Sequence, residues 1–148
     1  MTSHKMNRNK YEKYIVTGVR PDLELADFRI KTNDFVPGME TRLLHLDEKT
    51  IKDSFYISCF WFWKGSEEVL VKPHVHEYDE VLACIGTNNE DPNDLGGEIE
   101  FWMDDEKYLI RKSCLIFVPK GLKHAPFIVR KVNTPIFHFT TGTTSMYI

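Results

Sequence analysis

The chain has 148 residues, of which 42% are hydrophobic and 28% charged, and its net charge at pH 7 is −3. This length and apolar fraction predict one domain with a packed core, which excludes a disordered protein. The pI of about 6.1 gives no general attraction for nucleic acid, and no run of about 20 apolar residues predicts a membrane span.

The first fifty residues carry weak secondary-structure signals, and we expect an N-terminal extension that contributes edge strands. Residues 1–9 are typical of a frayed tail, whereas residues 11–17 fit either a short helix or an edge strand. Residues 41–46 have the pattern of a strand that follows a Pro-Gly turn. The start of the chain lacks the apolar region of a signal peptide, so we expect a cytoplasmic protein.

The segment from Phe55 to Trp63 is the strongest predicted strand, because it is dense in aromatic and apolar side chains. One of its faces would line the interior, and the other would pack against the N-terminal segment or a second subunit. This stretch is compatible with a homodimer but does not itself show one. Tyr56, Phe60 and Phe62 share one face and are candidates for the wall of a ligand pocket; plain core packing is the alternative.

Two histidines one residue apart, His74 and His76, are candidate metal ligands on a strand predicted from Val69 to His76. Alternating side chains place them on one face, about 6–7 Å apart. Glu80 reaches the same ion only if residues 77–79 bend and Glu80 begins the next strand. The alternative is a chance pair of histidines on a surface strand.

The rest of the chain alternates short apolar segments with turns, without a long helical period. We expect a loop over 87–97, a turn over 104–106, and strands over 80–85, 98–103, 107–111, 115–118, 127–132 and 135–140. Eight or more short strands predict an all-β barrel or sandwich. The whole chain, 1–148, would then be a single domain with its core barrel over 55–140.

A third histidine, His124, follows a Pro/Gly turn in the segment Pro119 to His124. Together with His74, His76 and Glu80, this segment resembles the two motifs of the cupin superfamily, His-x-His-x3-Glu and Pro-x-Gly-x2-His. The resemblance implies a double-stranded β-helix, or jelly-roll barrel, in which these three histidines and the glutamate hold one divalent metal, and it also implies a homodimer. No internal repeat is visible, which indicates a single pair of motifs.

Three imidazoles and one carboxylate suit Fe, Mn, Ni, Co or Zn as the divalent ion, and an octahedral ion would keep two positions for other ligands. The resemblance implies a small-molecule ligand such as a hydroxy, keto or carboxylic acid, with dioxygenase, decarboxylase, isomerase or lyase chemistry. Three alternatives stay open: a binding or sensor domain without turnover, a closed structural zinc site, and a metal-free barrel similar to sugar-nucleotide epimerases.

Two further side chains have candidate roles in the same pocket. His138 shares a strand face with Ile136 and Thr140, and it would be a catalytic base or ligand contact if that face is the interior. The alternative is a histidine whose ring is satisfied by a backbone carbonyl. Lys72 shares the face of His74 and would attract an anionic ligand at the pocket mouth; a solvated lysine is the alternative.

The remaining reactive side chains receive no place in this site. Cys59, Cys84 and Cys114 each lie in an apolar segment without clustered spacing, which predicts buried free thiols. His45 lacks the spacing of a metal ligand and is assigned no role.

Overall fold

The computed structural model describes residues 9–147, so residues 1–8 of the predicted tail lie outside the description. Within this range, two 3-10 turns are the helical elements, η1 (Glu12–Tyr14) and η2 (Thr32–Asp34). The eight strands are β1 (Glu40–Leu46), β2 (Tyr56–Phe62), β3 (Glu80–Ile85), β4 (Asp94–Met103), β5 (Glu106–Lys112), β6 (Cys114–Val118), β7 (His124–Val132) and β8 (Ile136–Gly142). None of the described helices is long and apolar enough to cross a bilayer.

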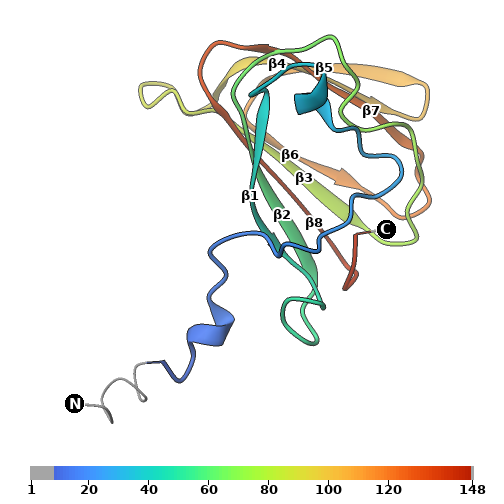
Figure 1. The fold of residues 1–148 in the computed structure, drawn as a ribbon. Helices are drawn as coiled ribbons and strands as arrows, with labels where there is room; N and C mark the ends of the chain where they lie inside the picture. The colour runs from blue at the N-terminus through green and yellow to red at the C-terminus, as the bar shows by residue number, and fades with distance from the viewer. Residues whose placement is uncertain (1–8, 148) are drawn as a thin grey trace.

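The strands form two antiparallel sheets that face each other (Figure 1). The five-stranded sheet has the order β1-β2-β8-β3-β6, and the three-stranded sheet has the order β5-β4-β7. Strands distant in sequence lie side by side, as β8 does between β2 and β3, which is typical of a jelly roll. The all-β prediction is confirmed, and the arrangement is the double-stranded β-helix that the cupin resemblance implies.

The core lies between the two sheets and is built from the inward faces of the strands. β2 shows the strict alternation of buried and half-buried residues that one inward face requires. Tyr56, Phe60 and Phe62 are buried on that face, as expected. Phe60 and Phe62 belong to a cluster of buried aliphatic and aromatic side chains that includes Leu70, Leu95, Ile99, Phe101, Phe127 and Ile136.

The predicted strand from Val69 to His76 is not a regular strand, which corrects the sequence interpretation. Only isolated bridges occur there, pairing Val71 with both Arg29 and Phe127, and His74 with His124. Pro73 lies between Val71 and His74 and has no N–H to donate, so a continuous ladder cannot form across it. The ligand segment is therefore an extended chain bridged at Val71 and at His74.

The loop predicted over 87–97 is shorter than expected, because β4 already begins at Asp94. The pairing of β4 with β5 shifts between Asp94 and Ile99, and Gly96 within this stretch has a φ of +72°. This left-handed conformation favours glycine and lets the strand bulge while it continues. A bulged strand breaks the period-2 pattern, which explains why the sequence signal was that of a loop.

The N-terminal segment and the cysteines complete the fold. Residues 11–17 contain the short turn η1 and no edge strand, and η1 lies away from the two sheets (Figure 1). All three cysteines are free thiols, as predicted. Only Cys84 is fully buried, however: Cys59 lies on the half-buried outward face of β2, and Cys114, at the start of β6, is only partly buried where it packs against the core.

Candidate metal centre

His74 and His124 face each other across the second isolated bridge. The His74 amide donates to the His124 carbonyl at 3.1 Å, and the His124 amide donates to the His74 carbonyl at 3.0 Å. Their ring centroids lie 4.3 Å apart. Two motifs separated by some fifty residues of chain are thus joined by a reciprocal pair of backbone hydrogen bonds. This pairing fixes the backbone positions from which both side chains extend.

The same two rings are oriented by equivalent contacts to their own backbone. Nδ1 of His74 lies 2.6 Å from the Lys72 carbonyl, and Nδ1 of His124 lies 2.9 Å from the Leu122 carbonyl. A carbonyl only accepts, so each Nδ1 carries the proton and each neutral ring has its lone pair at Nε2. A second contact of this kind is what orients a metal-binding histidine.

The Nε2 edges of the three rings converge. His74, His76 and His124, called here the histidine cluster, offer ligand nitrogens that all lie within 4.8 Å of one another. Nε2 of His74 lies 2.9 Å from Nε2 of His76. Nε2 of His124 is buried and has no hydrogen-bond partner among the described residues. A buried lone pair without a donor is costly, and a divalent cation at this point would satisfy it.

Glu80 joins the cluster by the route that the sequence predicted. The chain bends at Glu77 and Tyr78, and Glu80 is the first residue of β3. Its Oε1 lies 3.3 Å from Nε2 of His124 and 3.7 Å from Nε2 of His76. The structure therefore brings all four predicted ligands together, with the carboxylate beside two of the three imidazoles.

The Glu80 carboxylate is positioned by Tyr56, whose hydroxyl donates to Oε2 at 2.5 Å. Burial raises the pKa of Glu80, but the adjacent His124 ring and the Tyr56 hydroxyl outweigh it and hold that pKa below its usual value. Glu80 is thus ionised at neutral pH, with Oε1 turned toward the histidine cluster. A charged, oriented carboxylate and bare imidazole nitrogens fit a divalent transition metal.

Beside the cluster lies an inner cavity in which about 30 Å³ is open to the centre of a water molecule. That space is enough for one or two waters or a small ligand group. Its walls are largely apolar, and they include Phe60, Leu70, Leu82, Phe101 and Phe127. Interactions between charges in such a setting are stronger than in bulk water.

The predicted pocket residues lie at different distances from this cavity. Phe60 lines it, and Tyr56 reaches the site through its hydroxyl. Phe62 lies behind His138, with ring centroids 5.1 Å apart, and is not among the described residues that line the cavity. Lys72 is exposed and is also not one of them; its contact with the site is the carbonyl that holds His74.

His138 lines the inner cavity and is buried. Its Nδ1 donates to the Ala83 carbonyl at 2.7 Å, which is the backbone partner of the alternative interpretation. Burial lowers the pKa of His138 to about 4, so the ring is neutral at pH 7. The one side chain thus has both features: a satisfied Nδ1 and a ring that forms part of the cavity wall.

Several residues of the site lie outside the two motifs and were missed. Phe28 stacks on His74 with ring centroids 3.6 Å apart, and Arg29, Arg42 and Tyr147 line the inner cavity. They come from the N-terminal segment, β1 and the C-terminal end. Phe28, Arg29 and Tyr147 lie on irregular chain, and Arg42 reaches the cavity through the register of β1; no local periodicity encodes either.

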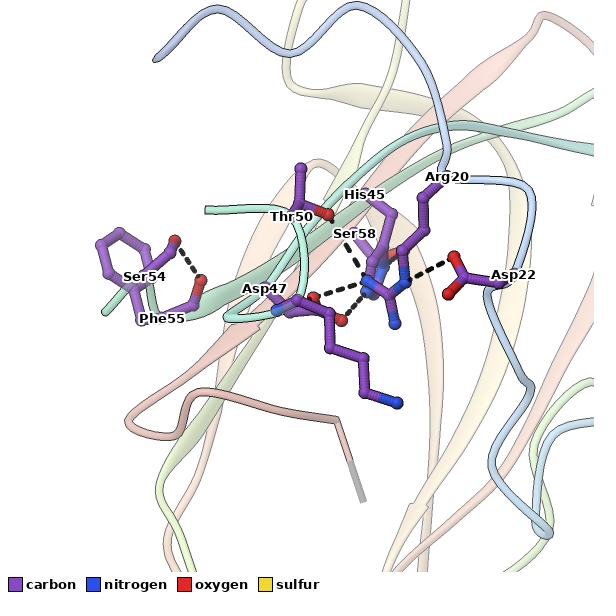
Figure 2. A network of polar contacts seen from close by, with 9 residues as sticks. Arg20, Asp22, His45, Asp47, Thr50, Ser54, Phe55 and Ser58 are labelled. Atoms are coloured by element: carbon purple, nitrogen blue, oxygen red, sulfur yellow. Dashed lines mark hydrogen bonds and ion pairs between the residues drawn. The ribbon is translucent and has the colours of Figure 1, made fainter. Parts of the chain in front are cut away.

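A second buried histidine also escaped prediction. Nδ1 of His45 lies 3.1 Å from Ser58 Oγ, and its Nε2 lies 2.9 Å from Asp47 Oδ2. Arg20 donates to Asp47 Oδ1 at 2.5 Å (Figure 2). Arg20, His45, Asp47 and Ser58 are called here the His45 network. The spacing His-x-Asp at a strand end is its only sequence signal, since Arg20 and Ser58 are distant in the chain.

No protein-family model and no curated protein matches the chain. Solved structures similar to it include oxalate oxidase in complex with the substrate analogue glycolate, an RmlC-like cupin from Shewanella frigidimarina, and KdgF from Halomonas sp.. Identities are 14%, 17% and 16%, and TM-scores are 0.48, 0.43 and 0.43. The alignments cover 74%, 70% and 78% of this chain and 53%, 73% and 94% of those chains. The chain therefore spans about half the length of the oxalate oxidase.

Proposed function

We propose that this chain, a protein with the cupin fold, binds one divalent transition-metal ion through His74, His76, Glu80 and His124. The observation that carries the proposal is the convergence of three imidazole nitrogens within 4.8 Å of one another, with the Glu80 carboxylate 3.3 Å from the buried Nε2 of His124. Neutral imidazoles with one carboxylate suit Fe, Mn, Ni, Co or Zn. An ionised carboxylate cannot donate to that nitrogen, whereas a cation between Glu80 Oε1 and His124 Nε2 would satisfy both.

We further propose that the ion binds a small hydroxy, keto or carboxylic acid, and that the protein is a metalloenzyme of the dioxygenase, decarboxylase, isomerase or lyase type. The bound metal would supply a Lewis acid that polarises an oxygen of this ligand. The inner cavity beside the ligands supports this proposal, because its apolar walls exclude bulk water. Tyr56 would keep the Glu80 carboxylate oriented during ligand exchange.

His138 is the proposed proton acceptor. Its Nδ1 proton is committed to the Ala83 carbonyl, so the lone pair is at Nε2. A ring that lines the inner cavity is near the ligand that the metal would hold. The neutral state that burial enforces is the state in which a histidine accepts a proton.

The second candidate function is a metal-dependent binding or sensor domain without turnover. The same burial that keeps His138 neutral lowers its pKa to about 4, which makes it a weak base at pH 7. That observation favours binding without proton transfer.

A homodimer, a cytoplasmic location, and the division into an N-terminal extension and a core barrel stay predictions.

The test is elemental analysis of protein purified without oxygen. We expect about one transition-metal ion per chain in the wild type and little in His76→Ala, because a lost ligand weakens the hold of the others. His45→Gln is the matched control, since it alters a buried histidine outside the cluster and should keep the metal. Equal metal content in wild type and His76→Ala would contradict the proposal.

The two candidate functions are then separated by incubating the metal-loaded protein with small hydroxy, keto and dicarboxylic acids, with and without oxygen. A product that requires the metal, and that decreases in His138→Gln while metal content is unchanged, supports the enzyme. Saturable binding without any product supports the binding domain.

A further inference from the structure

Two arginines converge on one wall of the inner cavity. Arg29 precedes η2 and Arg42 lies on β1, and both line the cavity together with His74, Glu80 and His124. Their guanidinium carbons lie 5.2 Å and 4.9 Å from the centroid of the Phe60 ring. The face of one aromatic side chain thus holds two cations beside the histidine cluster.

The two arginines differ in their partners. Nη2 of Arg29 donates to Oε1 of Glu40 at 2.5 Å, and its Nη1 donates to the Ile30 carbonyl at 2.8 Å. The Arg42 guanidinium makes no hydrogen bond or ion pair with another residue of the described range 9–147. Arg29 is therefore a paired cation with a structural role, whereas Arg42 keeps its donors available.

Arg42 is also placed where a ligand can reach it. It lines both the inner cavity and a larger outer cleft of about 420 Å³, and Tyr147 is the other residue that lines both. Burial and the nearby Arg29 lower the pKa of Arg42 to about 10, so it stays charged at neutral pH. A partly desolvated cation whose N–H donors make no hydrogen bond gains when an anion accepts from them.

The balance of charge indicates how many negative charges the ligand carries. Arg29 and Arg42 are offset by Glu40 and Glu80 when the histidines are neutral. A divalent ion in the histidine cluster would therefore leave two positive charges around a small, largely apolar cavity. A ligand with two negative charges restores neutrality, and a monoanion does not.

We infer that the site binds a short dicarboxylate, with one carboxylate at the histidine cluster in the inner cavity and the other on the guanidinium of Arg42, which also lines the outer cleft. The metal end of this ligand rests on the proposed function; the Arg42 end rests on the arginine geometry alone. Arginine suits the second carboxylate because its planar fork donates two parallel hydrogen bonds. The small volume of the cavity limits the spacer between the carboxylates to a short one.

The test is calorimetric titration of the metal-loaded protein with malonate, acetate and the uncharged malonamide. We expect malonate to bind most tightly and malonamide not measurably. Arg42→Met should weaken malonate binding by about 10- to 100-fold, the effect of a lost charge-assisted hydrogen bond pair. The same change should alter acetate binding by less than about threefold, since acetate needs only the metal. Metal content should equal that of the wild type.

Two further variants control for charge and folding. Arg111→Met removes the same charge from an exposed ion pair with Glu98 outside the cavity and should leave malonate binding unchanged. Arg42→Lys keeps the charge but loses the fork, so it should recover only part of the malonate affinity. If Arg42→Met does not fold, the malonate affinity of Arg42→Lys is compared with that of Arg111→Met. A lower affinity in Arg42→Lys supports the role of Arg42, and an equal affinity contradicts it.

The outcomes separate this inference from the proposed function. Malonate binding that is equal in wild type, Arg42→Met and Arg42→Lys overturns the inference while the metal site stands. A wild type that takes up no metal overturns the proposed function. In that case the weak binding of acetate to the metal-free wild type is compared with its binding to metal-free Arg42→Met. Weaker acetate binding in the variant upholds the anion site at Arg42, and equal binding overturns it.

Discussion

The histidine cluster and the His45 network are both buried and both rich in imidazole, yet they use their ring nitrogens differently. In the network, Ser58 and Asp47 occupy both nitrogens of His45, and Arg20 balances the charge of Asp47. In the cluster, backbone carbonyls occupy Nδ1 of His74 and His124 and leave the Nε2 edges turned toward one another. Burial alone therefore does not distinguish a structural histidine from a ligand; the partner of the second nitrogen does.

The largest effect is expected when a ligand is removed from the histidine cluster while the His45 network is left intact. His124→Ala should lower the affinity for Zn or Ni on the order of 1,000-fold, about 4 kcal/mol, because it deletes the ligand that joins the two motifs. Competition titration with a chromophoric chelator measures it. His45→Ala should bind metal as the wild type does. Similar losses of metal affinity in His124→Ala and His45→Ala would contradict the proposed difference between the two regions.

Acid should destabilise the metal-free protein through its neutral buried histidines. Burial lowers the pKa of His138 to about 4, against about 6.5 in an unfolded chain, and it also lowers the pKa of His45. The unfolded chain therefore binds protons first as pH falls, so stability is full above about pH 6.5 and declines toward pH 4. Asp47, with its lowered pKa, adds a loss only at still lower pH.

The share of His138 in this pH dependence is about 3 kcal/mol across that interval. Urea denaturation at pH 7.5 and pH 5 measures the free energy of unfolding, and His138→Gln should show a smaller difference between the two. An identical difference in the variant would mean that His138 is not held neutral.

Disrupting the His45 network should cost stability and spare metal binding. His45→Ala leaves the buried Asp47 and Ser58 each without one partner, which should lower the free energy of unfolding by about 2 kcal/mol. His45→Gln retains one hydrogen-bonding group and should lose less. Chemical denaturation together with metal analysis reports both quantities. Lost metal at unchanged stability would reverse the roles assigned to the two regions.

The smallest effect is expected from a change at Tyr56, which contacts the Glu80 carboxylate beside the histidine cluster. Tyr56→Phe removes the hydroxyl that donates to Glu80 and should weaken metal binding by about 10-fold, because the carboxylate loses its fixed orientation. Tyr14→Phe, which removes an exposed hydroxyl far along the chain, is the matched control. An unchanged affinity in Tyr56→Phe would mean that the Tyr56 hydroxyl does not position the Glu80 carboxylate for metal binding.

The sequence predicted most strands and the four candidate ligands, because both signals are local. β3 has the predicted bounds, and the bend before Glu80 follows from the residues that precede it. The strand predicted up to His76 does not form as a regular strand, because Pro73 interrupts its backbone hydrogen bonds. Arg42 and the His45 network escaped because their partners are set by strand register and chain crossings, which no short motif records.

One feature of the fold has a consequence for handling the protein. Glu80 begins a strand of the five-stranded sheet, whereas His124 begins a strand of the three-stranded sheet. An ion shared by these two residues would act as a reversible cross-link between the halves of the sandwich. The melting temperature would then follow the concentration of free metal in the buffer. A chelator would lower that temperature without breaking a covalent bond.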